Sequence, residues 1–163
     1  MFLRSLHDAT VTLGVKTAEK AEVFRALLDS LPEKRFSAEQ KDRFVKLLLK
    51  REDLGTTAVG DQLALPHAFI GELEAPLVVL GVSSEGIDCG ALDGDLVHVF
   101  FLVLLPDSEL GREAKREIFQ KALILFSDRF TRQQLRQAAT CQEALEILRR
   151  ECLTSVVSPA AAL

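Results

Sequence analysis

The run Leu96–Leu105 constrains the fold more than any other segment of the chain. It is apolar except at His98, and Pro106 closes it. It has the length of a strand, well short of the ~18 apolar residues that a membrane-spanning helix needs. A strand without polar alternation is buried on both faces of its sheet. The chain must therefore supply helices that cover both faces.

Further apolar segments predict strands beside this run. Leu63–Leu65 lacks alternation, and Pro66 marks its end or an edge position because proline has no N–H to donate. Leu77–Val82 predicts a second strong strand, and Thr10–Val15 alternates weakly. The segments expected to be loops are Thr56–Asp61 and Ser83–Gly94.

Helical periodicity appears on both sides of the strands in the sequence. Ser37-Ala38-Glu39-Gln40 and Thr140-Cys141-Gln142-Glu143 are capping-box patterns, which mark helix starts. The predicted helices begin at Thr17 and Ser37, span Glu109–Phe126 and Asp128–Ala138, and follow Thr140. Apolar strands among amphipathic helices indicate an α/β fold, with a small sheet between helical layers.

The length and composition favour one domain. The chain has 163 residues, of which 48% are hydrophobic, enough for a single substantial core. We expect this domain to cover residues 1–152. Residues 153–163 carry little charge and no clear pattern, and we expect a flexible C-terminal tail.

Charge and motifs argue against several functions. A net charge of −4 and a pI near 5.4 disfavour nucleic acid as the ligand. The N-terminus lacks the layout of a signal peptide, so a cytoplasmic location is expected and no membrane-embedded segment. The three cysteines form no metal-binding pair, and we predict reduced thiols. No phosphate-binding glycine loop or hydrolase elbow is present, and we predict neither a metal nor a cofactor.

His67 is the strongest candidate for chemistry. It follows Pro66, and we expect it in the loop after a predicted strand, where α/β folds place reactive groups. A neutral imidazole is a good nucleophile and can carry a phosphoryl group. From the pattern alone, a structural histidine that bonds a backbone carbonyl is the stronger interpretation. His98, inside the longest strand, is expected to have a structural role, although it could support His67.

Arg51 closes the second helix, sixteen residues before His67. A guanidinium beside a phosphorylated histidine would bind the phosphate oxygens in a fork. By itself, however, an exposed cation that complements the helix dipole is the simpler interpretation.

Several motifs together resemble one known family. They are Arg51–Thr57, Gly60–His67, Ala91–Gly94, Val97–Leu102 and Leu105-Pro106. In this order they resemble the IIA domains of the bacterial phosphoenolpyruvate-dependent phosphotransferase system, of the fructose/mannitol type that includes the nitrogen-regulatory branch. The likeness covers roughly residues 5–150.

The resemblance implies a fold, a reaction and partners. It implies a single α/β domain with a small mixed sheet flanked by helices on both sides. It makes His67 the acceptor of a phosphoryl group from the phosphocarrier HPr, without a cofactor. It makes Arg51 the cation that stabilises the phosphate and Asp61 a residue that orients the site. The phosphoryl group would pass to a IIB domain, or its presence would control a regulated protein.

The chain departs from the family at one point. Members usually carry a second active-site histidine early in the helix after the Leu-Pro strand end, and this chain has none there. Lys115 falls nearest that position, and Lys115 or Arg112 could hold phosphate as a fixed charge. Neither could act as a neutral imidazole. A regulatory protein-binding module that has lost efficient transfer is therefore the alternative function. The sequence identifies neither the sugar nor the oligomeric state.

Overall fold

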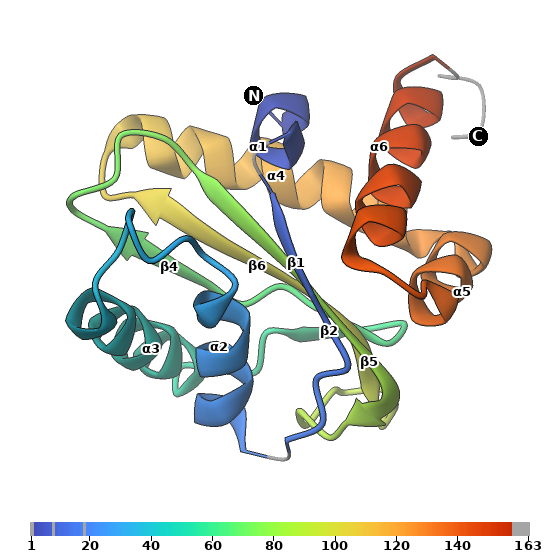
Figure 1. Cartoon of the computed structure of the whole chain (residues 1–163), viewed down its shortest axis with the longest axis horizontal. Helices are drawn as coiled ribbons and strands as arrows, with labels where there is room; N and C mark the ends of the chain where they lie inside the picture. Colours follow the sequence, from blue (N-terminus) through green and yellow to red (C-terminus); the bar gives the residue numbers. More distant parts are fainter. Residues whose placement is uncertain (1, 8, 18, 158–163) are drawn as a thin grey trace.

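The computed structural model describes residues 2–7, 9–17 and 19–157. They form a mixed six-stranded sheet between two layers of helices (Figure 1). One layer holds α2 (Lys20–Asp29) and α3 (Ala38–Glu52). The other holds α1 (Phe2–His7), α4 (Glu109–Ser127), α5 (Arg129–Gln137) and α6 (Cys141–Val157). The predicted α/β class, with helices on both faces of a small mixed sheet, is confirmed.

The sheet is built around the segment that constrains the sequence most. The strands are β1 (Thr10–Leu13), β2 (Ala58–Gly60), β3 (Leu63–Ala64), β4 (His67–Ile70), β5 (Leu77–Ile87) and β6 (Val97–Pro106). Their order is β1-β5-β6-β3-β2, and β4 also pairs with β6. β6 is parallel to β3 and β4 but antiparallel to β5. All of its residues are buried, as its unbroken apolar sequence predicts.

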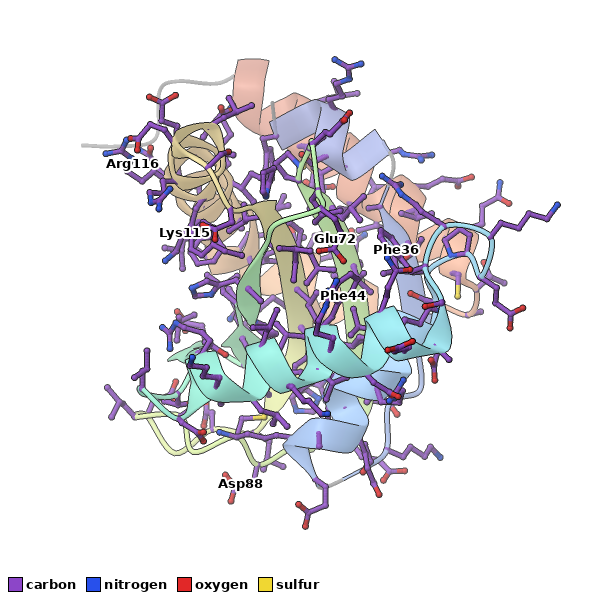
Figure 2. All side chains as sticks on the ribbon, turned by 90° about the vertical axis from the view of Figure 1, so that its left-hand side faces the viewer. Phe36, Phe44, Glu72, Asp88, Lys115 and Arg116 are labelled. Atoms are coloured by element: carbon purple, nitrogen blue, oxygen red, sulfur yellow. The ribbon has the colours of Figure 1, made fainter. Side chains whose placement is uncertain are left out.

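Alternate residues of β6 enter two separate cores. Phe101 and Val103 pack with α4, α5 and α6, whereas Phe100 and Leu102 pack with α2 and α3. Figure 2 shows Phe44 pointing from α3 toward the sheet, and its ring meets Phe36 edge-on at 5.4 Å. The two cores fix the sheet between α3 and α4.

Pro66 interrupts what would otherwise be one strand beside β6. β3 ends at Ala64 and β4 starts at His67, and both are parallel to β6. Proline has no N–H for the ladder, but its carbonyl still accepts from Val103 N at 2.9 Å. The prediction that His67 lies in a loop after the strand is wrong. It is the first residue of β4.

His98 supports an irregular stretch of β5. The strand continues to Ile87 through a register shift after Val82, where the sequence predicts a loop. His98 Nδ1 lies 2.8 Å from the Ser83 carbonyl, and a Cβ on Gly86 would lie 2.9 Å from the His98 ring. Because a carbonyl only accepts, this nitrogen is the donor. The structural interpretation of His98 is thus supported.

Some helix starts agree with the sequence and others do not. The Ser37 capping box is present, with Gln40 reaching back to the Ser37 N–H. The start at Thr17 is wrong, because α2 begins at Lys20 and the Thr17 hydroxyl bonds Glu22 instead. α1 has no counterpart in the sequence predictions.

The last helix, α6, extends beyond the predicted end of the domain. α6 continues to Val157, into the predicted tail, and residues 158–163 lie outside the described part of the chain. None of the described helices is both long and apolar enough to cross a bilayer.

Candidate active site

His67 is held at the start of β4 with its ring almost entirely buried. Its register partner on β6 is Val103, and only 4% of the residue is exposed. The ring of Phe119, from α4, meets the His67 ring edge-on with the centroids 4.9 Å apart. The imidazole is therefore enclosed between the sheet and α4.

Hydrogen bonding fixes which ring nitrogen is free to react. His67 Nδ1 lies 2.9 Å from the carbonyl oxygen of Leu65. Because a carbonyl can only accept, Nδ1 carries the hydrogen and Nε2 carries the lone pair. Arg51 Nε donates to Nε2 at 3.2 Å. Nε2 is therefore the nucleophilic atom, and it already faces a guanidinium.

The surroundings keep the His67 ring neutral. Burial lowers the pKa of His67 from 6.5 to about 4, and the positive charges of Lys115 and Arg51 act in the same direction. The Leu65 hydrogen bond and the Glu52 carboxylate oppose this shift. At neutral pH Nε2 therefore carries no proton of its own.

Arg51 lies in the last turn of α3 and is fixed by the chain that follows it. Its NH1 donates to the carbonyl of Gly55 at 3.0 Å. The adjacent Glu52 accepts from the backbone N and hydroxyl of Thr57 and from Lys20 Nζ at 2.9 Å. The hydrogen bonds of Glu52 hold the segment after α3 in place, so Arg51 can reach His67 across the contact between α3 and β4.

Lys115 approaches the same site from α4. Its Nζ lies 5.6 Å from the centre of the Phe119 ring and 5.9 Å from that of Phe69. Burial, followed by the charge of Arg51, lowers the pKa of Lys115. In Figure 2, Lys115 lies between the α4 ribbon and α3, whereas Arg116 lies farther from α3. Lys115, the side chain predicted to replace the second histidine, is thus close enough to interact electrostatically with both Arg51 and His67.

Arg112 lies one turn earlier on α4 and is more exposed. Its guanidinium carbon is 5.9 Å from the centre of the Phe69 ring, and its NH2 is 3.8 Å from Asp107 Oδ1. Arg112 is therefore at the rim of the site, with an acidic partner already beside it.

Asp61 lies in the tight turn between β2 and β3. Its φ of 52° is in the left-handed region, and its backbone N–H donates to Asp93 Oδ2 at 2.9 Å. Gly60 has a φ of 93°, and a Cβ there would lie 2.9 Å from the same oxygen. The contact explains why Gly60 stands before Asp61 and why the segment Ala91–Gly94 supplies an aspartate. The orienting role of Asp61 stays a prediction.

Comparison with known proteins identifies the family. Residues 4–151 match the family model of the phosphoenolpyruvate-dependent sugar phosphotransferase system, EIIA 2. The chain belongs to this family. This EIIA 2 domain is 24% identical over 139 residues to the fructose-specific EIIABC component of the phosphotransferase system of Bacillus subtilis, a match that covers 85% of the chain. It covers 21% of that relative, so the chain spans about a fifth of the relative's length.

Solved structures share the fold of this EIIA 2 domain. The nitrogen regulatory protein IIA-Ntr of Neisseria meningitidis superposes with a TM-score of 0.75 at 23% identity, over 88% of this chain and 97% of that one. Enzyme IIAMTL of Escherichia coli, in its complex with phosphorylated enzyme IIBMTL, gives a TM-score of 0.66 at 22% identity, over 85% and 93%. The predicted family is confirmed.

Three parts of the site were not predicted from the sequence. Phe119 was placed only on the apolar face of its helix, and nothing in the pattern separates it from core residues. The carbonyl of Leu65 leaves no trace in a sequence. Glu52, directly after Arg51, was visible as an acid at a helix end, where it opposes the dipole. The unfavourable position of this acid at a helix C-terminus is the one signal in the sequence that points to a role for Glu52.

Within the described residues, no cluster suited to a metal is found.

Proposed function

We propose that this EIIA 2 domain carries a phosphoryl group on Nε2 of His67, received from the phosphohistidine of HPr. The observation that supports this most directly is the hydrogen bond from His67 Nδ1 to Leu65, which leaves Nε2 unprotonated. The lowered pKa of His67 keeps it unprotonated throughout the neutral range.

The transfer requires Arg51 to change partner. In the structure its Nε–H occupies the lone pair that must attack. As the donor approaches, the guanidinium turns to the phosphate oxygens and frees Nε2. A P–N bond to His67 forms while the P–N bond to the donor ring breaks, and that electron pair returns to the donor ring. The bond from Nδ1 to Leu65 can stay intact throughout.

Positive side chains would then hold the phosphoryl group. Arg51 and Lys115 approach His67 from α3 and α4, and Arg112 adds charge at the rim. The oxygen atoms of a phosphoryl group bound to Nε2 would lie among these cations. Fixed charges stabilise a developing anion because the protein does not need to reorganise around it. In this scheme Asp61 shapes the turn that precedes the His67 segment.

The recipient of the phosphoryl group has two candidates. The name of the Bacillus subtilis relative joins EIIA to further components, and the Escherichia coli structure pairs IIAMTL with phosphorylated IIBMTL. These two relatives support transfer to a IIB domain. A cytoplasmic location is part of the same proposal. The Neisseria meningitidis structure is a nitrogen regulatory protein. Lys115, in place of an imidazole, favours a regulatory module in which the phosphoryl group is retained as a signal.

Labelling with a phosphoryl donor tests the proposal. Phosphoenolpyruvate, enzyme I and a verified HPr should add one acid-labile phosphate to the wild type. His67→Ala should abolish the label, and His98→Gln, a matched change at a histidine outside the site, should retain it. Label that persists in His67→Ala would exclude His67 as the acceptor. A wild type that stays unlabelled would favour the alternative in which the domain has lost efficient phosphotransfer and acts only as a protein-binding module. Adding a IIB domain to labelled protein then separates transfer from retention.

A further inference from the structure

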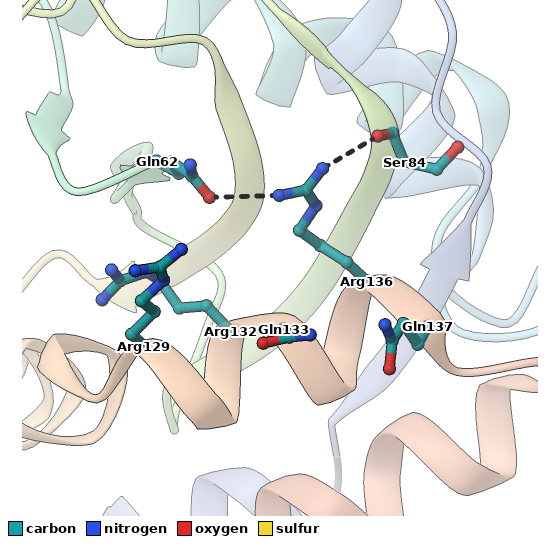
Figure 3. Close-up of a pocket in the computed structure, with 7 residues that line it drawn as sticks. All are labelled: Gln62, Ser84, Arg129, Arg132, Gln133, Arg136 and Gln137. Carbon is teal, nitrogen blue, oxygen red and sulfur yellow. Dashed lines mark hydrogen bonds between the residues drawn. The ribbon is translucent and has the colours of Figure 1, made fainter.

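Three arginines of α5 line a cavity that is separate from the contacts of His67. The cavity has a volume of about 520 Å³, and Arg129, Arg132 and Arg136 form one wall. Gln62, from the turn before β3, and Ser84, from β5, close the other side (Figure 3). None of these residues contacts His67, Phe119 or Lys115 through any bond described above.

The sequence places these charges together at an electrostatic cost. Positions 129, 132 and 136 recur at helical spacing, so they share one face of α5. Like charges at such spacings repel one another, and among the described residues no acidic side chain lines the cavity. Asp128 caps α5 by accepting from the N–H and hydroxyl of Thr131, and these hydrogen bonds are the main reason that its pKa is lowered, with a smaller contribution from the charge of Arg132. In a chain with a net charge of −4, this wall is conspicuously basic.

Two of the guanidinium groups retain unused capacity for hydrogen bonds. Arg132 is only 8% exposed, and its NH1 donates to the carbonyls of Phe126 and Ser127. Its buried Nε has no partner among the described residues. Arg129, which is exposed, forms no ion pair within the part of the chain that the structure describes. The buried Nε of Arg132 is not accessible from the cavity, so an anion there would supply acceptors to the exposed Arg129 guanidinium.

Arg136 has only weak partners that a ligand could replace. It donates to Gln62 Oε1 at 3.5 Å and to the Ser84 carbonyl at 3.4 Å, both long for hydrogen bonds. Figure 3 shows its guanidinium between these two acceptors. The Gln62 backbone is firmly held, because its carbonyl accepts from the N–H groups of His98 and Val99 at 2.9 and 3.0 Å. The wall opposite Arg136 is therefore preformed.

We propose that this cavity binds a phosphorylated sugar or polyol with at least two phosphate groups. Guanidinium forks match phosphate oxygens, and three of them suit a ligand with several negative charges. The amides of Gln62, Gln133 and Gln137 can both donate to and accept from hydroxyl groups. Within the part of the chain that the structure describes, no aromatic side chain lines the cavity to stack on a nucleobase. The volume is within the usual range for a small-molecule site.

Calorimetric titration tests the site directly. The probes are fructose 1,6-bisphosphate, inorganic pyrophosphate, ATP, a hexaglutamate peptide and uncharged fructose. Fructose 1,6-bisphosphate should bind most tightly, and fructose should not bind. The Arg129→Gln/Arg136→Gln double variant should bind at least about tenfold more weakly, because each charge-assisted contact contributes about that factor. Arg35→Gln, a matched change at an exposed arginine on the loop before α3, should leave affinity unchanged.

Each other outcome overturns part or all of the proposal. Equal affinity in the double variant, or no binding at millimolar concentration, excludes the site. Tighter binding of ATP excludes the sugar class, and equal binding of pyrophosphate reduces the site to a general anion site. Tighter binding of a hexaglutamate peptide would indicate an acidic protein partner instead. His67→Ala should bind the bisphosphate like the wild type, so failure of the phosphoryl-carrier function and failure of this site are distinguishable.

Discussion

Acidification should destabilise this protein through His67 by an amount that the structure allows us to work out. Burial and two neighbouring cations lower the pKa of His67 to about 4, from 6.5 in an exposed chain. Above pH 6.5 the ring is neutral in both the folded and the unfolded state, and stability is complete. As the pH falls from 6.5 toward 4, the unfolded chain takes up the proton first. The free energy of unfolding therefore decreases across this window.

The magnitude follows from the two pKa values. Proton linkage predicts a loss of about 2 kcal/mol between pH 7.5 and pH 5 and about 3 kcal/mol by pH 4. Losses of this size are a large fraction of the 5–15 kcal/mol that typical domains have, so they are readily measured.

Urea unfolding of the wild type and of His67→Gln at pH 7.5 and pH 5 isolates this contribution. The variant loses the same packing at both pH values, and the other titrating groups are common to both proteins. The wild type should thus lose about 2 kcal/mol more than the variant on acidification. An equal loss in both would refute the reasoning. So would an NMR titration of the His67 ring with a midpoint near 6.5.

Three substitutions test other parts of the structure. Arg51→Lys should slow phosphorylation of His67 by about tenfold to a hundredfold in the HPr assay, because a lysine cannot form the guanidinium fork. An unchanged rate would exclude Arg51 as the residue that stabilises the phosphate. Gly60→Ala should lower the free energy of unfolding by about 1–3 kcal/mol, since the φ is positive and the new Cβ would meet Asp93, and a neutral change in urea would contradict this. Ser37→Ala should cost about 1 kcal/mol in the same assay through loss of the α3 cap, whereas no loss would mean that the cap is dispensable.

The sequence predicts those elements whose signals are local. The capping box at Ser37 is a contact between residues three apart, and it appears in the structure as written. The burial of β6 follows from its uninterrupted apolar residues. These features depend little on the rest of the chain, which is why the α/β class and most helix positions could be predicted.

Features that depend on distant partners could not be read in the same way. β5 continues to Ile87 because that residue pairs with Val97 of β6, and Gly86 leaves the space that the His98 ring occupies. α2 starts later than Thr17 because the chain is still bonded to β5 at Val15, whose N–H donates to Val82 at 3.2 Å. In both cases tertiary pairing overrides a local signal for a loop or a helix.

The candidate site shows the same limit. Arg51 and His67 are sixteen residues apart on different elements, and only the packing of α3 against β4 brings them to 3.2 Å. Periodicity alone favoured an exposed arginine and a structural histidine. The family resemblance joined them, and the geometry supplies the physical reason: a buried ring whose free nitrogen faces a cation.

The charge pattern of the site also bears on whether a phosphoryl group is passed on or retained. Without phosphate, burial followed by the charge of Arg51 lowers the pKa of Lys115, and burial followed by both cations lowers the pKa of His67, so the cations oppose one another around a neutral ring. A phosphoryl group on Nε2 would reverse the sign of this interaction, because its oxygens attract both cations. An imidazole in place of Lys115 could give up its charge as the group leaves, whereas a lysine keeps most of it. This difference predicts slower release of the phosphoryl group, and adding a IIB domain to labelled protein measures that release directly.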